Sequence, residues 1–124
     1  MSETVQDSTG ARVKVEHDEQ NSEFVVRVDS GEVAGRARYL DRPAPQPERI
    51  IYHVEVDSRF SERGLEKILI SHTLKDTSNS NLMVVPVCPL VVARLKEHGN
   101  DFLAIGGRYR WATEADVEFV KQTP

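Results

Sequence analysis

Cysteine is nearly absent from this chain, in which Cys88 is the one such residue among 124. A single cysteine cannot form an intrachain disulfide. The four histidines (His17, His53, His72 and His98) are too scattered along the sequence to suggest a zinc cluster with it. We therefore predict neither a disulfide scaffold nor a bound metal.

Long apolar runs and an excess of positive charge are also missing. No stretch of about eighteen apolar residues occurs, so the sequence predicts no membrane-spanning helix. Residues 1–7 are polar and acidic, which argues against a secretory signal and predicts a cytoplasmic protein. The net charge of −4 and the isoelectric point near 5.6 predict no general attraction to nucleic acid or to anionic lipid.

The remaining composition is that of one ordinary domain, with 39% hydrophobic and 29% charged residues. Residues 1–22 are rich in Ser, Thr, Asp, Glu and Gln, and we expect a mobile tail there. Val13 and Val15 alternate within residues 12–16, which leaves open a short strand contact at the end of the tail. We expect the folded domain over residues 23–111 and a C-terminal helix packed on it within residues 112–124.

The centre of the chain is a strand, a polar turn and a helix over residues 50–75. Alternation along the strand at residues 50–56 puts His53 and Glu55 on one face. An apolar stripe then marks the helix that starts at Gly64 and ends at Lys75. The N-terminus of a helix placed after such a turn leaves backbone N–H groups free for a phosphate.

Other elements surround this centre. Residues 23–29 and 32–40 alternate as a hairpin, and residues 41–49 contain three prolines and form a loop. Residues 82–87 predict a buried strand, followed by a helix over residues 90–98. Because a helix connects it to the central strand, we expect these two strands to be parallel neighbours.

Three short motifs resemble one family in their order and spacing. They are His-Val-Glu-Val at residues 53–56, Arg-Gly-Leu at residues 63–65 and Pro-Val-Cys at residues 86–88. Over about residues 24–102 the chain is similar to the short single-domain branch of the GNAT superfamily of N-acetyltransferases. The resemblance implies an α/β (α+β) fold with helices packed on a mostly antiparallel sheet that contains a central parallel strand pair. It also implies acetyl-CoA as acetyl donor and a small-molecule or peptide amine as acceptor.

The resemblance also implies roles for particular residues. Glu55 is the expected general base, and the N–H groups around Arg63, Gly64, Leu65 and Glu66 are expected to hold the pyrophosphate. Cys88 is expected to act as acyl acceptor or proton donor. It precedes Pro89 as a helix N-cap, where the helix dipole favours a thiolate. The alternatives are a surface polar residue for Glu55 and a packing residue for Cys88.

The phosphate loop departs from the family pattern of Gln/Arg-x-x-Gly-x-Gly/Ala. Among the fixed positions only Gly64 is kept, with Arg63 as a compatible basic neighbour, while Ser61, Glu62 and Glu66 replace other residue types. Each added carboxylate costs on the order of 1–3 kcal/mol of pyrophosphate binding at an effective dielectric constant near 20. The loop therefore predicts weakened acetyl-CoA binding.

The C-terminal residues extend beyond the resemblance. Arg-Tyr-Arg-Trp at residues 108–111 is a basic and aromatic segment, suited either to an anion or to packing with solvated charge. Thr113 has the signature of an N-cap for a helix over residues 114–122. We expect Val117 and Val120 to face the body of the protein.

Two functional hypotheses follow. In the first, the protein is an N-acetyltransferase that uses acetyl-CoA. In the second, it is a catalytically degenerate binding protein with the same fold and weak or no CoA affinity, and the groove or residues 108–111 recognise a protein or peptide. The sequence does not identify the acceptor or the oligomeric state.

Overall fold

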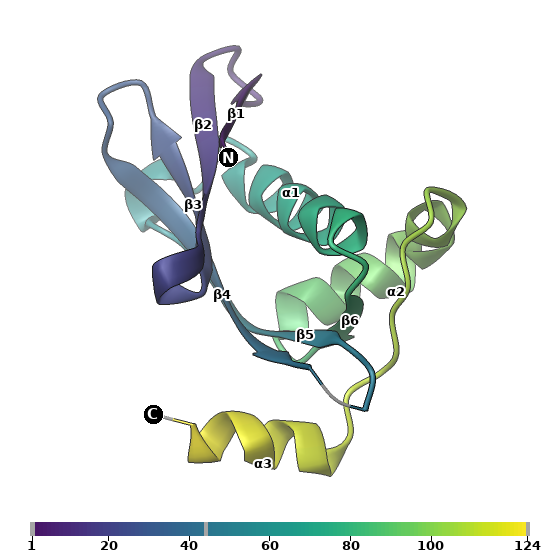
Figure 1. Cartoon of the computed structure of the whole chain (residues 1–124). Helices are drawn as coiled ribbons and strands as arrows, with labels where there is room; N and C mark the ends of the chain where they lie inside the picture. The colour runs from purple at the N-terminus through teal and green to yellow at the C-terminus, as the bar shows by residue number, and fades with distance from the viewer. Residues whose placement is uncertain (1, 44, 124) are drawn as a thin grey trace. The chain divides into compact units, whose positions relative to one another are not determined.

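The structure, a computed structural model, describes residues 2–43 and 45–123. The predicted tail, loop and C-terminal helix each include one residue, Met1, Ala44 and Pro124 respectively, that lies outside this description. One six-stranded sheet runs in the order β1-β2-β3-β4-β5-β6 (Figure 1). The strands are β1 (Ser2–Gln6), β2 (Arg12–Asp18), β3 (Glu23–Val28), β4 (Val33–Arg42), β5 (Glu48–Val56) and β6 (Met83–Pro86). The helices are α1 (Leu65–Asn79), α2 (Pro89–Ala104) and α3 (Glu114–Gln122), with 3₁₀ turns η1 (Glu19–Asn21) and η2 (Ser58–Phe60).

The fold class is the predicted one. The chain forms a mixed α/β domain in which β1 to β4 pair antiparallel and β5 pairs with β6 in parallel. In the described part of the chain, none of the helices is both long and apolar enough to cross a membrane.

The chain divides into two compact units. The first comprises Met1–Arg38 and Val54–Thr73, and the second comprises Tyr39–His53 and Leu74–Pro124. Each has fully buried apolar side chains. In the first unit these include Val13, Val15, Phe24, Val26, Leu65 and Leu69, and in the second Ile50, Ile51, Val84, Val85, Val91 and Leu95.

Residues 2–22 differ from the predicted tail, because they form β1, β2 and η1. Val13 lies opposite Val28 and Val15 lies opposite Val26 in the antiparallel ladder of β2 with β3. All four side chains are buried. The alternation of Val13 and Val15 indicated at most a short strand contact, and pairing with β3 is what stabilises β2 over its full length.

The parallel pair confirms the predicted topology and ends where the sequence places a proline. β5 pairs with β6 from Glu48 opposite Met83 to Ile51 opposite Pro86. Pro86 has no N–H to donate. The N–H groups of Val87 and Cys88 then both donate to the Ile51 carbonyl, at 3.0 and 3.1 Å. β5 thus continues to Val56 beyond the end of its pairing with β6.

Two helices are longer than predicted. Residues 76–79, which follow the predicted end at Lys75, continue α1, where Asp76 accepts a hydrogen bond from the buried Arg49 at 3.4 Å. Residues 99–104 continue α2 past His98, whose backbone is not helical (φ −126°, ψ 18°). A Cβ at Gly99 would lie 2.4 Å from the Tyr109 hydroxyl oxygen, so a larger residue there would displace the Tyr109 ring.

The segment at residues 108–111 supports the packing alternative. Tyr109 forms a parallel bridge with Val84 of β6, and Arg108 donates to the Asn81 carbonyl at 3.0 Å. Arg110 donates through Nε to Glu48 at 2.6 Å and through Nη1 to Asp116 at 2.8 Å. The guanidinium of Arg110 therefore forms ion pairs with two carboxylates of the protein itself.

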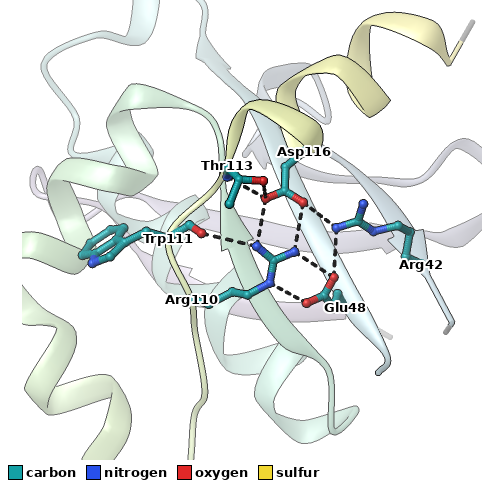
Figure 2. A network of polar contacts seen from close by, with 6 residues as sticks. All are labelled: Arg42, Glu48, Arg110, Trp111, Thr113 and Asp116. Carbon is teal, nitrogen blue, oxygen red and sulfur yellow. Dashed lines mark hydrogen bonds and ion pairs between the residues drawn. The ribbon is translucent and has the colours of Figure 1, made fainter. Parts of the chain in front are cut away.

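α3 has the predicted bounds but presents a different residue to the interior. Thr113 is the N-cap, as the sequence predicts. It forms a capping box with Asp116. Val117 is exposed, contrary to the prediction, and Asp116 is buried with 2% exposure. Arg42 and Arg110 both bond the Asp116 carboxylate, and both also bond Glu48 (Figure 2). We call these four side chains the ion quartet.

The quartet shifts the ionisation of its acids. Hydrogen bonds from Arg110, opposed by burial and supported by Thr113 and Arg42, hold the pKa of Asp116 far below its usual range. Hydrogen bonding to Arg110 also lowers the pKa of Glu48. Both carboxylates are therefore ionised at neutral pH.

Candidate functional site

Glu55 lies on β5 in the first unit, on a face shared with Arg36 of β4. Its Oε1 atom lies 4.0 Å from Arg36 Nε, and Arg36 Nη1 donates to the buried Glu23 at 3.0 Å. β4 approaches closely here, because a Cβ on Gly35 would lie 2.8 Å from the Glu55 carbonyl oxygen. The structure thus places the guanidinium of Arg36 beside the Glu55 carboxylate.

An open pocket of about 240 Å³ adjoins Glu55. It is lined by Val33, Ala34, Gly35, Arg36, Glu55, Val56 and Asp57. A second hollow of about 330 Å³ shares Val33 and Arg36 with it and extends over β2 and β3. This face of the first unit is therefore open and polar beside Glu55.

The turn before α1, which the sequence predicts as the phosphate loop, has the predicted order of strand, turn and helix. β5 leads through η2 to Gly64, which adopts a left-handed conformation (φ +70°) immediately before α1. The first turn of a helix has N–H groups with no intrahelical acceptor, and at α1 these belong to Leu65, Glu66 and Lys67. Such a terminus favours an anion through both its donors and the helix dipole.

The side chains of this loop contribute little free positive charge. Glu62 and Glu66 are exposed. The Arg63 N–H donates to the Phe60 carbonyl at 3.3 Å, and its guanidinium donates through Nε to the carboxylate of Asp7. Of the four predicted loop residues, Arg63 thus has a carboxylate partner, and Gly64, Leu65 and Glu66 can offer an anion their backbone N–H groups.

Asp7 was not predicted from the sequence as part of this region. Its side chain is fully buried, and its Oδ1 accepts from the Thr9 N–H at 2.8 Å, the Thr9 hydroxyl at 2.6 Å and the Ala11 N–H at 3.1 Å. The Asp-Ser-Thr-Gly sequence at residues 7–10 is typical of a turn and was the available signal. Its partner Arg63 lies 56 positions away, which no local pattern indicates.

Cys88 lies in the second unit at the predicted N-cap of α2, with Pro89 at the first helical position. The thiol makes no capping hydrogen bond, and the residue is 5% exposed. This burial favours the packing alternative over a reactive thiol.

Alkylation of Cys88 tests that alternative. We expect iodoacetamide to modify the native protein more slowly than a model thiol at neutral pH, and to modify it rapidly in denaturant, because burial blocks access. Mass spectrometry over time measures the rate, and the chain has one cysteine to follow. Fast alkylation of the native protein, slowed by acetyl-CoA, would instead restore Cys88 as a catalytic candidate.

Together these features define a class. A six-stranded, mostly antiparallel sheet with one parallel strand pair, accompanied by three helices, matches the fold of an acetyltransferase domain of the GNAT type. The sequence model of the GCN5-related N-acetyltransferase family matches residues 23–103. The chain belongs to this family.

Several solved structures are similar to the chain. A ribosomal-protein-alanine N-acetyltransferase from Brucella melitensis biovar Abortus 2308 is 20% identical, with a TM-score of 0.49, over 82% of this chain and 68% of that one. The aminoglycoside N-acetyltransferase AAC(6')-Iy in complex with CoA is 21% identical, with a TM-score of 0.45, over 69% and 59%. An aminoglycoside acetyltransferase from an uncultured soil metagenomic sample is 19% identical, with a TM-score of 0.45, over 68% and 55%. This chain spans 55% to 68% of their lengths. The comparison with curated proteins gave no significant match.

Proposed function

We propose that this protein is an N-acetyltransferase that transfers the acetyl group of acetyl-CoA to an amine. The observation that carries the proposal is Gly64, a left-handed glycine directly before α1 within the segment that matches the family. A glycine in this conformation lets the backbone turn so that successive N–H groups point at one anion.

The backbone N–H groups of the loop suit a pyrophosphate, whereas the negative charge of its side chains opposes one. Gly64, Leu65 and Glu66 would hold the phosphates through their N–H groups. The exposed carboxylates of Glu62 and Glu66 oppose the same anion, so we expect weak affinity. When bound, acetyl-CoA supplies an acetyl group activated as a thioester.

Glu55 is the proposed general base. An attacking amine must be neutral, and a carboxylate on an exposed strand face can accept its proton directly or through a water molecule. The pocket beside Glu55 is open and polar, which suits a small-molecule or a peptide amine. Cys88 is the second candidate group, as acyl acceptor or proton donor, and the alkylation experiment decides its part.

A catalytically degenerate binding protein is the second candidate function. It is favoured by the combination of Glu62 and Glu66 in the loop and of Arg63 paired with Asp7. In that case the fold persists, since hydrophobic patterning and not loop chemistry determines it.

A thermal-shift titration with CoA and with acetyl-CoA separates the two candidates. Ligand that binds the native state raises the melting temperature, by the equivalent of about 2.7 kcal/mol at 100 times Kd. We expect the wild type to respond and a Gly64→Val variant not to respond. Gly31→Val is the matched control, because Gly31 also has a left-handed backbone (φ +88°) with nothing near its Cβ position, in the turn between β3 and β4.

Activity is then measured as release of the CoA thiol with a panel of peptide and small-molecule amines. We expect Glu55→Gln to lower the rate on the order of 10²- to 10⁴-fold while the CoA-induced thermal shift is unchanged. Absence of any shift in the wild type at millimolar CoA would reject the acetyltransferase and leave the binding protein.

A further inference from the structure

The turn between β1 and β2 lies against the phosphate loop, and both belong to the first unit. The Ser8 N–H donates to the Arg63 carbonyl at 3.0 Å, and the Ser8 hydroxyl donates to the Glu62 carbonyl at 3.4 Å. Ser8 Cβ lies 3.5 Å from the position that a Cβ on Gly64 would occupy. This turn lies outside residues 23–103, so the family match does not include it.

Asp7 ties the same turn to the Arg63 side chain. Its carboxylate is fully buried, whereas the Arg63 side chain is 23% exposed. Hydrogen bonding from the Thr9 hydroxyl, opposed by burial and supported by Arg63, lowers the pKa of Asp7 to about 2. The acid is therefore ionised at neutral pH, and the pair carries no net charge.

We infer that Asp7 is a positioning residue that withholds the Arg63 guanidinium from the pyrophosphate, so that the loop holds its ligand through backbone N–H groups. The inference rests on the proposed function. A guanidinium is a strong phosphate ligand because its donors form a fixed fork. Here the Nε donor is already used by Asp7, and the neighbouring negative charge cancels the long-range attraction for a phosphate.

Asp7→Asn is the informative variant. An asparagine of the same shape keeps an Oδ1 acceptor for Thr9 and Ala11, so the turn is preserved. It replaces the oxygen that Arg63 uses with an amide nitrogen, which cannot accept. Arg63 is then free to reach the loop.

CoA affinity is measured by calorimetry at low and high salt, with the melting temperature of each variant as a check on folding. We expect Asp7→Asn to tighten CoA about three- to tenfold at low ionic strength, with the gain shrinking as salt rises. The gain should disappear in the double variant Asp7→Asn/Arg63→Gln. Arg63→Gln alone should change affinity by less than about twofold, because the paired guanidinium contributes little.

Glu16→Gln is the matched control. It also removes one negative charge from an Arg-bonded carboxylate of the first unit, since Glu16 accepts from Arg27 Nε at 2.6 Å. It should leave CoA affinity unchanged, which excludes a general effect of net charge.

The outcomes separate the inference from the proposed function. Suppose that the wild type binds CoA. If Asp7→Asn then binds no more tightly, or if the double variant keeps the gain in affinity, the inference is overturned and the proposed function is not. A tenfold loss in Arg63→Gln also overturns it, and this test stands even where Asp7→Asn does not fold. Binding by Asp7→Asn but not by wild type rejects the proposed function, because the wild-type loop then does not hold CoA through its backbone N–H groups, and it supports only the withholding of Arg63 by Asp7. Binding by neither protein rejects the proposed function and the inference with it.

Discussion

Replacing Arg110 by Met should lower the free energy of unfolding by about 3 kcal/mol. Arg110 separates the carboxylates of Glu48 and Asp116, which are 13% and 2% exposed. Without its guanidinium, two poorly solvated acids share the single cation of Arg42. Breaking a buried ion pair by removing one partner is costly because it leaves an uncompensated charge. Urea unfolding followed by circular dichroism measures the loss.

Arg108→Met is the matched control, two residues away on the same segment. Arg108 is exposed and donates to the Asn81 carbonyl, with no carboxylate of the quartet as its partner. We expect a change of less than about 0.5 kcal/mol, as is usual for surface substitutions. Equal losses in the two variants would mean that the quartet adds nothing beyond an ordinary surface contact.

The dependence of stability on pH is a second, independent test of the ion quartet. Asp116 and Glu48 have a lower pKa in the folded protein than in the unfolded chain, chiefly through hydrogen bonds from Arg110. Their stabilisation is therefore present above about pH 4 and lost as the pH falls further, because protonation removes the acceptors. Arg110→Met should show a shallower acid limb than the wild type. An unchanged acid limb would place the acid sensitivity in other carboxylates.

The sequence predicted the elements whose signals are local. The strand, turn and helix around Gly64 follow from hydrophobic alternation and from the apolar stripe of α1. Thr113 and Asp116 mark the start of α3 through their capping signature. The parallel pairing of β5 with β6 follows from the helix that connects the two strands. Each of these features depends on signals within one element or between consecutive elements.

The features that escaped prediction depend on distant partners. β2 is stable because Val13 and Val15 meet β3, and its own polar composition suggested a tail. Asp116 faces the interior because Arg42, 74 positions away, supplies a counter-charge there. The hydrophobic pattern by itself predicted that Val117 would face the interior. Long-range ion pairs thus decided both the orientation of α3 and the availability of Arg63.

Removing the two acids of the phosphate loop should tighten CoA binding by about tenfold or more at low salt. Glu62 and Glu66 are both exposed and flank Gly64. Their charges repel a pyrophosphate at the N-terminus of α1, each by on the order of 1 kcal/mol in this partly solvated setting. Calorimetry with CoA at low and high ionic strength measures the effect, and the gain should shrink as salt screens it.

Two double variants distinguish the effect of the negative charges from the effect of side-chain size on CoA affinity. Glu62→Gln/Glu66→Gln removes the charges and keeps the side-chain volume, whereas Glu62→Gly/Glu66→Ala also lets the backbone approach the phosphates. The control Glu19→Gln/Asp29→Asn removes two exposed charges of the same unit at positions outside the loop. We expect both loop variants to gain affinity and the control to change little.

The comparison between the two loop variants determines the cause of weak binding. If charge dominates, the Gln pair reaches most of the gain of the Gly/Ala pair, and both gains fall with salt in parallel. If close approach dominates, only the Gly/Ala pair improves, and its gain is independent of salt because no charge interaction carries it. If neither variant improves on the wild type, the two acids are not what limits binding. The pairing of Arg63 with Asp7 then becomes the leading cause, since it removes the one cation of the loop that the family pattern would accept.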